Sequence, residues 1–130
     1  FMIDGGPARK ALSELRKVMP FYDRSIDALL VTNPDADHYA GFIDIIKSFT
    51  IAHVISPGTQ SATPTYKYFS DEVKDEQSST TVARRGQVYH LGGGADLYIL
   101  FPDRDISTLE SNEGSTIAKL VYKNTSVLLT

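Results

Sequence analysis

The sequence predicts an α/β fold, with strands alternating with helices in the first half and short strands filling the second half. A nearly continuous apolar run over residues 26–31 is typical of a strand that is covered on both faces. Phe42, Ile45, Ile46 and Phe49 then recur at helical spacing, which predicts an amphipathic helix. After Ser78 the pattern changes to short strands separated by turns, so the second half is β-rich.

The first half contains two further helices and two further strands. Residues 1–3 read as the last part of a strand, followed by a glycine turn and a helix from Ala8 that stops at Pro20. Residues 51–55 form the next strand. Thr63 and Pro64 resemble an N-cap followed by proline at the first helical position, which predicts a helix.

The second half is predicted as five short strands and one long loop. The strands cover residues 80–83, 87–91, 97–101, 116–122 and 126–129, with a triple-glycine turn before the third. Residues 103–115 are polar enough for a long loop beside the site.

Composition indicates one ordinary globular domain. The chain has 130 residues, of which 42% are hydrophobic and 22% charged. It has no cysteine, so any metal must be held by histidine, carboxylate or amide oxygen. A net charge of −3 lacks the basic footprint of a duplex-binding domain, and no stretch approaches the roughly 20 apolar residues of a membrane span.

A polar loop after the buried strand is the candidate site. Asn33, Asp35, Asp37 and His38 place an amide, two carboxylates and an imidazole within six residues, at the strand end where α/β folds gather ligands. Such a set can hold a divalent cation. The alternative is that Asn and Asp cap the following helix and shape a turn.

These residues also carry a family resemblance. Residues 32–41, TNPDADHYAG, resemble the metallo-β-lactamase superfamily loop Thr-His-x-His-x-Asp-His and its following glycine. They are most similar to the variant His-Pro-Asp-Ala-Asp-His of the soluble hydrolase-like domain of bacterial competence proteins, which take up DNA. Three further stretches look like parts of that domain in the same order: residues 3–6, Asn112 with Ser115, and residues 127–130.

The resemblance implies an αββα sandwich of two sheets between helices, with a metal site along one edge. It implies zinc or manganese as cofactor, with Asp37 and His38 as a ligand pair, Asp35 as a further ligand and Asn33 at a degenerate position. Asp37 would also act in catalysis by orienting the attacking water. Asn33 replaces a histidine, and an amide oxygen is a weaker zinc ligand than imidazole nitrogen.

Other candidate residues have competing interpretations. Asn112 and Ser115 are candidate substrate-binding residues, but a turn before the next strand needs such residues as well. Arg84 and Arg85 can grip a phosphate or form a solvated hairpin. His53 and His90 are interpreted as packed or surface histidines, and neither is assigned to the metal.

We expect residues 1–130 to be a partial metallo-β-lactamase-like domain, the N-terminal and central part only, truncated at both ends. The expected function is that of a metal-dependent hydrolase acting on a phosphodiester such as DNA, with the isolated piece inactive and the rest of the parent domain as its partner. The resemblance implies a bacterial protein, in the cytoplasm or at the cell surface if attached to a competence-type membrane protein. The alternatives are a non-catalytic binding or scaffold module with a decayed metal site, or a lactonase, thioesterase or β-lactamase-like hydrolase.

Overall fold

A four-stranded parallel sheet and three helices form the first half of the protein. The computed structural model describes residues 1–8, 10–111 and 113–130. The sheet order is β1 (Met2–Ile3), β2 (Ser25–Leu30), β3 (Thr50–Ser56) and β4 (Ser79–Val82). The helices α1 (Lys10–Val18), α2 (Ala36–Ile46) and α3 (Pro64–Asp75) connect successive strands of this sheet. The alternation of strands and helices that the sequence predicted is therefore confirmed.

The second half is a four-stranded antiparallel sheet in sequential order. Its strands are β5 (Val88–His90), β6 (Ala95–Phe101), β7 (Ile117–Tyr122) and β8 (Thr125–Leu129). The expected triple-glycine turn joins β5 to β6, and all three glycines have positive φ angles, which a side chain would disfavour. The long polar loop lies between β6 and β7, as predicted.

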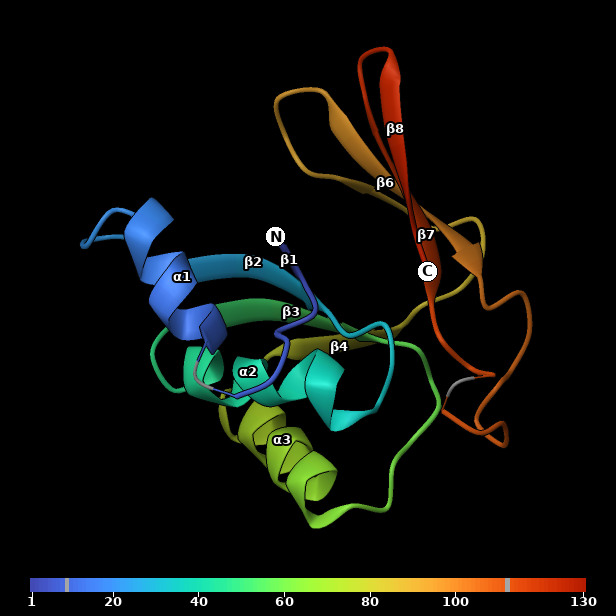
Figure 1. The fold of residues 1–130 in the computed structure, drawn as a ribbon, viewed down its shortest axis with the longest axis horizontal. Helices are drawn as coiled ribbons and strands as arrows, with labels where there is room; N and C mark the ends of the chain where they lie inside the picture. Colours follow the sequence, from blue (N-terminus) through green and yellow to red (C-terminus); the bar gives the residue numbers. More distant parts are fainter. Residues whose placement is uncertain (9, 112) are drawn as a thin grey trace.

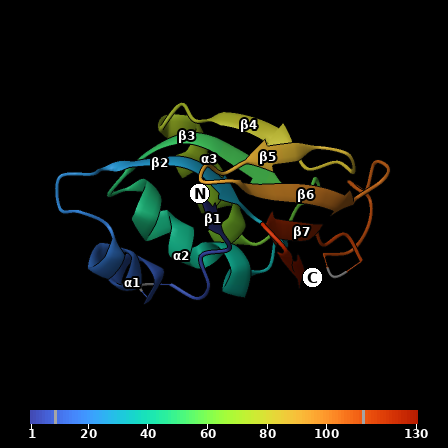
Figure 2. The ribbon, with the colours of Figure 1, turned by 90° about the horizontal axis from the view of Figure 1, so that it is seen from above.

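The elements stack in three layers: helices, parallel sheet and antiparallel sheet. Figure 1 shows the three helices on one side of the parallel sheet and the antiparallel sheet on the other; in Figure 2, from above, antiparallel strands lie over part of the parallel sheet. Buried side chains form a cluster between each pair of layers. In the described residues no helix covers the outer face of the antiparallel sheet, so these residues form three layers of an αββα sandwich.

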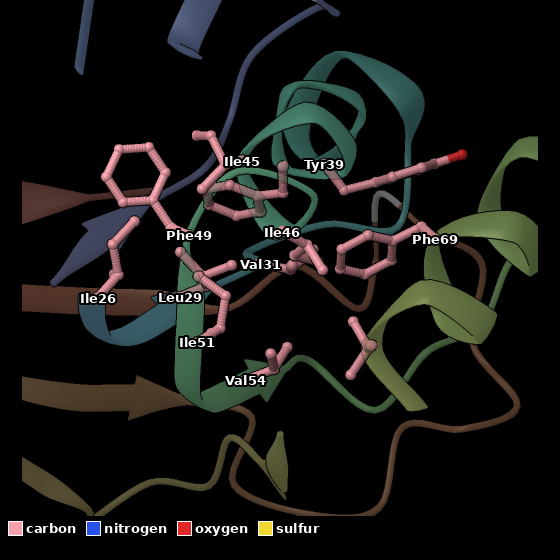
Figure 3. Packing of buried hydrophobic residues seen from close by; sticks show 12 residues of the cluster. Ile26, Leu29, Val31, Tyr39, Ile45, Ile46, Phe49, Ile51, Val54 and Phe69 are labelled. Carbon is pink, nitrogen blue, oxygen red and sulfur yellow. The ribbon is translucent and has the colours of Figure 1, made fainter. Parts of the chain in front are cut away.

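The helix-side core fixes the position of α2 over the sheet. Figure 3 shows side chains of α2 and α3 meeting those of β2 and β3. Tyr39 is fully buried, and its ring lies 5.2 Å from the Tyr66 ring and 5.3 Å from the Phe69 ring. Aromatic pairs at such separations stabilise beyond their buried area. These contacts with α3 therefore hold the first turn of α2 in place.

One helix boundary differs from the prediction. The sequence interpretation took residues 32–38 as a loop with the helix after it, whereas α2 begins at Ala36. Asp35 occupies the N-cap position, and its carbonyl oxygen accepts a hydrogen bond from the His38 amide at 2.9 Å. The polar residues of the first turn face the sheet edge and water, so they add nothing to the apolar pattern. Asp37 and His38 therefore lie on a helix and not in a loop.

The carboxyl ends of the parallel strands bring several loops to one edge of the molecule. The loops after β1, β2 and β3 leave the sheet there, since parallel strands end on the same side. The Thr116 amide donates to the Thr32 carbonyl at 2.7 Å, which joins the start of the β7 segment to this edge. No helix within the described residues has the length and apolar character needed to cross a bilayer.

Candidate metal site

Asp4, Thr32 and His38 form a hydrogen-bonded network at this edge. The Asp4 carboxylate accepts hydrogen bonds from the Thr32 amide at 2.8 Å and the Thr32 hydroxyl at 2.6 Å. His38 Nδ1 lies 2.8 Å from Asp4 Oδ2. Because a carboxylate only accepts, Nδ1 is the donor in this contact, and in the neutral ring Nε2 then carries the lone pair. The network therefore fixes both the orientation and the tautomer of the His38 ring.

A close crossing of two backbones holds Asp4 beside His38. The Gly5 amide donates to the His38 carbonyl at 2.6 Å, and the Gly41 amide donates to the Gly6 carbonyl at 2.9 Å. A Cβ atom at Gly41 would lie 2.0 Å from the Gly5 carbonyl oxygen, and one at Gly5 would lie 2.6 Å from the Phe42 nitrogen. Glycine at both positions lets the loop after β1 lie directly against the start of α2.

His38 and Asp37 each have a solvent-accessible side chain with an atom that can bind a metal ion. His38 Nε2 lies 4.0 Å from Asp37 Oδ2, and the side chains are 33% and 75% exposed. An imidazole nitrogen and a carboxylate oxygen are donors that zinc accepts. Within the described ranges, however, no group of three or more His, Cys, Asp or Glu side chains is arranged to hold a metal ion. Asp37 and His38 would supply two of the three protein ligands that a catalytic zinc site uses.

Asp35 lies just before this pair, at the N-terminus of α2. The sequence interpretation had Asp35, Asp37 and His38 converge, and the strand, loop and helix that carry them are present in the expected order. Asp35 instead stands at the N-cap of α2, where its side chain makes no capping hydrogen bond. Its assignment as a ligand stays a prediction.

Asn33 is buried, and both the oxygen and the nitrogen of its side-chain amide form hydrogen bonds. Its side-chain oxygen accepts from the Asp35 amide at 2.8 Å, and its Nδ2 donates to Ser115 Oγ at 2.9 Å and to the Ser111 carbonyl at 3.3 Å. The residue is 3% exposed. This geometry favours the turn-shaping interpretation of Asn33, which ties the loop after β2 to the β6–β7 loop. Its assignment to a degenerate metal position stays a prediction.

Of the two candidate substrate-binding residues, the structure describes Ser115, while Asn112 lies outside the described residues. Ser115 accepts the hydrogen bond from Asn33 and also lines a shallow pocket with Phe101, Glu113 and Ile117. The β6–β7 loop that carries Ser115 packs tightly at this edge, since a Cβ atom at Gly114 would lie 2.1 Å from the Thr59 side chain.

In the same loop, the Ser107 amide lowers the pKa of Asp105 by a hydrogen bond to its carboxylate.

The remaining sequence candidates lie outside the network. His53 on β3 contacts the Ser79 hydroxyl through Nδ1, and His90 on β5 lies 2.7 Å from Asp96 on the outer sheet. Arg84 donates to the Ala83 carbonyl and lies 3.9 Å from Asp105. None of these side chains has a contact with Asp37 or His38 among those the structure describes.

The sequence interpretation missed Asp4 and Thr32 as parts of the site. Asp4 appeared only as the start of a glycine turn and within the stretch 3–6 that carries part of the resemblance, although its position directly after a strand was a usable signal. Parallel pairing places Ile3 beside Leu30, so the residues that follow both strands emerge together at the carboxyl edge. A carboxylate at that position can accept a hydrogen bond from an imidazole in the first turn of the helix that follows β2.

The comparisons with known proteins add a structural relative. No protein-family model matches the chain, and no curated protein sequence matches it. The crystal structure of zinc-bound PqqB from Methylobacterium extorquens is similar, with a TM-score of 0.56 and 14% identity over 95% of this chain. The chain spans 46% of the length of that structure.

CmlA, a diiron β-hydroxylase from Streptomyces venezuelae, has a TM-score of 0.48 and 16% identity, covering 85% of this chain and 20% of its own. That score is too low to support an argument. PqqB has the metallo-β-lactamase fold, and at this level of identity its likeness concerns the fold alone. With its parallel and antiparallel sheets stacked beneath one layer of helices, the chain has a metallo-β-lactamase-like fold.

Proposed function

We propose that this chain supplies part of the metal site of a metal-dependent hydrolase, with Asp37 and His38 as the ligands it contributes. The observation that carries the proposal is the hydrogen bond from His38 Nδ1 to Asp4 Oδ2 at 2.8 Å, which leaves Nε2 exposed beside Asp37. Metal-binding histidines commonly donate their second ring nitrogen to a carboxylate in this way, which fixes the ring and makes it a better ligand. His90 has a similar Nδ1 contact with Asp96 on the outer sheet, but among the described residues only His38 also has a carboxylate within 4.0 Å of its Nε2.

The residues of the chain have separate tasks in this proposal. Asp4 orients His38, and the Thr32 amide and hydroxyl hold Asp4 in turn. Asp37 is mostly exposed, so its second carboxylate oxygen is available to accept a hydrogen bond from a water and orient it. A bound zinc or manganese ion would supply Lewis-acid polarisation and a lowered pKa for that water.

The substrate class within the proposal is a phosphodiester such as DNA. Its support is the likeness of residues 32–41 to the loop of competence-type domains. The net charge of the chain is −3, so such a substrate would be held at the metal more than by the surrounding surface. Lactones, thioesters and β-lactams are the other substrates that the same chemistry serves.

A second candidate function is a binding or scaffold module whose metal site has decayed. The observation in its favour is Asn33, whose amide bonds Ser115 and the Asp35 backbone. Where a ligand histidine is expected, the chain has a residue that stabilises the loop. Two ligands among the described residues would then be a remnant.

Activity of the full-length gene product with added zinc or manganese separates these candidates. We expect hydrolysis of bis-p-nitrophenyl phosphate or single-stranded DNA that is lost with chelator and falls at least 100-fold in Asp37→Ala. Asp103→Ala removes an exposed carboxylate in the β6–β7 loop and is the matched control. Metal-dependent cleavage of nitrocefin or a lactone alone would reassign the substrate, and no metal-dependent activity on any of them would favour the binding module.

A further inference from the structure

The most exposed large hydrophobic side chains lie together at the corner between α1 and β2. Phe21 is 88% exposed, Val18 78% and Tyr22 75%, the three highest values among the large hydrophobic residues that the structure describes. The Phe21 and Tyr22 rings meet edge to face with centroids 5.4 Å apart. A clustered apolar patch of this kind marks an interaction surface, whereas isolated exposed residues do not. We call residues 16–24 with Phe49 the α1–β2 corner.

A small pocket opens beside these side chains. Its volume is about 180 Å³, and its walls are formed by Arg16, Met19, Pro20, Phe21, Asp23, Arg24 and Phe49. Pockets for drug-sized ligands or cofactors occupy roughly 300 to 1,000 Å³. A cavity of about 150 Å³ holds one benzene ring. The pocket therefore has the size for a single aromatic or aliphatic side chain.

Two arginines give the rim of this pocket a positive charge. In the part of the chain that the structure describes, neither Arg16 nor Arg24 forms an ion pair within 4.0 Å. The adjacent Asp23 carboxylate accepts hydrogen bonds from the Ser25 amide and hydroxyl and is thus turned to its own loop. The guanidinium groups are free to meet carboxylates of a partner, and aromatic residues, Met and Arg are the types enriched in protein interfaces.

We propose that the α1–β2 corner is a docking site for an acidic segment of a partner protein, whose apolar anchor side chain enters the pocket between Arg16 and Arg24. Single-stranded nucleic acid is the less suitable occupant. Protein sites that bind it combine aromatic rings that stack on the bases with a continuous basic groove that follows the nucleic-acid backbone. Here the basic groups are confined to one rim, on a chain whose net charge is −3.

The docking site is separate from the candidate metal site. The α1–β2 corner lies at the amino end of β2, and the loop to Asp37 and His38 leaves its carboxyl end; Figure 1 shows the α1–β2 loop at an extremity of the molecule. Variants at the corner therefore leave the metal ligands untouched, and the two proposals fail independently.

Backbone NMR of the ¹⁵N-labelled chain tests the docking site with a synthetic peptide, acetyl-Glu-Asp-Glu-Phe-Glu-Asp-Glu-amide. Saturable amide shifts are expected at residues 16–24 and 48–50, weakening as salt is raised. Replacing the peptide phenylalanine by alanine should weaken binding about tenfold or more, since the buried ring is the anchor. Arg16→Gln combined with Arg24→Gln should weaken it roughly fivefold, and Arg104→Gln, an exposed arginine in the β6–β7 loop, should leave it unchanged.

Four results would overturn the docking site. The first is the absence of saturable amide shifts up to about 1 mM peptide. The second is equal affinity for the peptides with phenylalanine and with alanine. The third is tighter binding of a thymidine oligonucleotide, measured at the same amides. The fourth is self-association in sedimentation that Phe21→Ser abolishes, which would assign the surface to a second copy. The substituted side chains are exposed, so we expect each variant to fold. An unchanged spectrum outside the corner verifies this.

Discussion

At the scale of single residues, Asp4 is the group on which the candidate metal site depends most. It accepts three hydrogen bonds, two from Thr32 and one from His38, and thereby sets the direction of His38 Nε2. Asp4→Asn keeps the size of the side chain but removes its charge and offers only one oxygen acceptor. We expect zinc affinity of the full-length gene product to fall 10- to 100-fold, as for other losses of a carboxylate behind a ligand histidine.

Isothermal titration with zinc measures this effect, and the chain offers a matched control. Asp96→Asn removes the carboxylate that lies 2.7 Å from His90 Nδ1 on the outer sheet, in a pair with the same chemistry but away from Asp37. It should leave zinc affinity unchanged. Equal losses in both variants would mean that the Asp4–His38 contact has no special relation to the metal.

Asn33 contributes to stability through its buried hydrogen bonds. Asn33→Ala removes the acceptor of the Asp35 amide and the donor to Ser115 while leaving a small cavity. Because buried groups that lose their partner cost about 1–3 kcal/mol, the free energy of unfolding should fall by about that amount. Urea denaturation measures it, with the exposed Gln60→Ala as a control expected to change stability by less than about 0.5 kcal/mol.

The same geometry bears on Asn33→His, which the loop resemblance predicts to raise zinc affinity more than tenfold. A histidine at this 3% exposed position must displace the bond to Ser115 before it can reach a metal. Stability and zinc affinity of that variant should therefore move in opposite directions if the degenerate-ligand interpretation holds. Lower stability without any gain in affinity would leave Asn33 as a structural residue.

At the scale of secondary-structure elements, the crossing of the β1–α1 loop over α2 makes the site possible. Gly41→Ala would normally stabilise a helix, by about 1 kcal/mol. Here the new Cβ atom would lie 2.0 Å from the Gly5 carbonyl oxygen, so the backbones must separate. We expect a net loss of about 1–3 kcal/mol, typical of overpacking, together with weakened zinc binding because Asp4 moves away from His38.

Thermal and urea unfolding of Gly41→Ala provide the check on this crossing. Ala36→Gly, at an exposed position of the same helix, calibrates the helix-propensity effect at about 0.5–1 kcal/mol. A stabilised Gly41→Ala variant would show that the two backbones are not in contact in solution.

The elements themselves were largely predictable, for physical reasons that differ along the chain. The strand β2 was evident from its nearly continuous apolar run, which Asp27 alone interrupts, and α3 because Thr63 caps it, accepting from the Tyr66 amide. The start of α2 was missed because Asp37 and His38 are polar, although the buried Tyr39, three residues before Phe42, continues the apolar period. The Asp4–His38 contact joins residues 34 positions apart, so it follows from the pairing of β1 with β2 and not from any local pattern.

At the scale of the whole molecule, the described residues hold two proposed metal ligands, Asp37 and His38, and one layer of helices. Two protein ligands neither bind an ion tightly nor define an open coordination position for water. We therefore expect the isolated 130-residue chain to hydrolyse neither DNA nor nitrocefin at a measurable rate with zinc or manganese. Metal-dependent turnover by this chain that Asp37→Ala abolishes would contradict the view that it supplies only part of a site.

If His38 presents its Nε2 to a metal beside Asp37, imidazole ¹⁵N NMR during a zinc titration detects the binding at that nitrogen. The chain has three histidines, and in each of them Nδ1 is already bonded to a neighbour, so His53 and His90 act as internal controls. Before zinc, the His38 signals should show a protonated Nδ1 and an unprotonated Nε2. Zinc should then shift His38 Nε2 selectively, at lower concentration than the other two, and Asp37→Ala should remove that preference. Equal responses from all three histidines, or a His38 ring protonated at Nε2, would contradict the account.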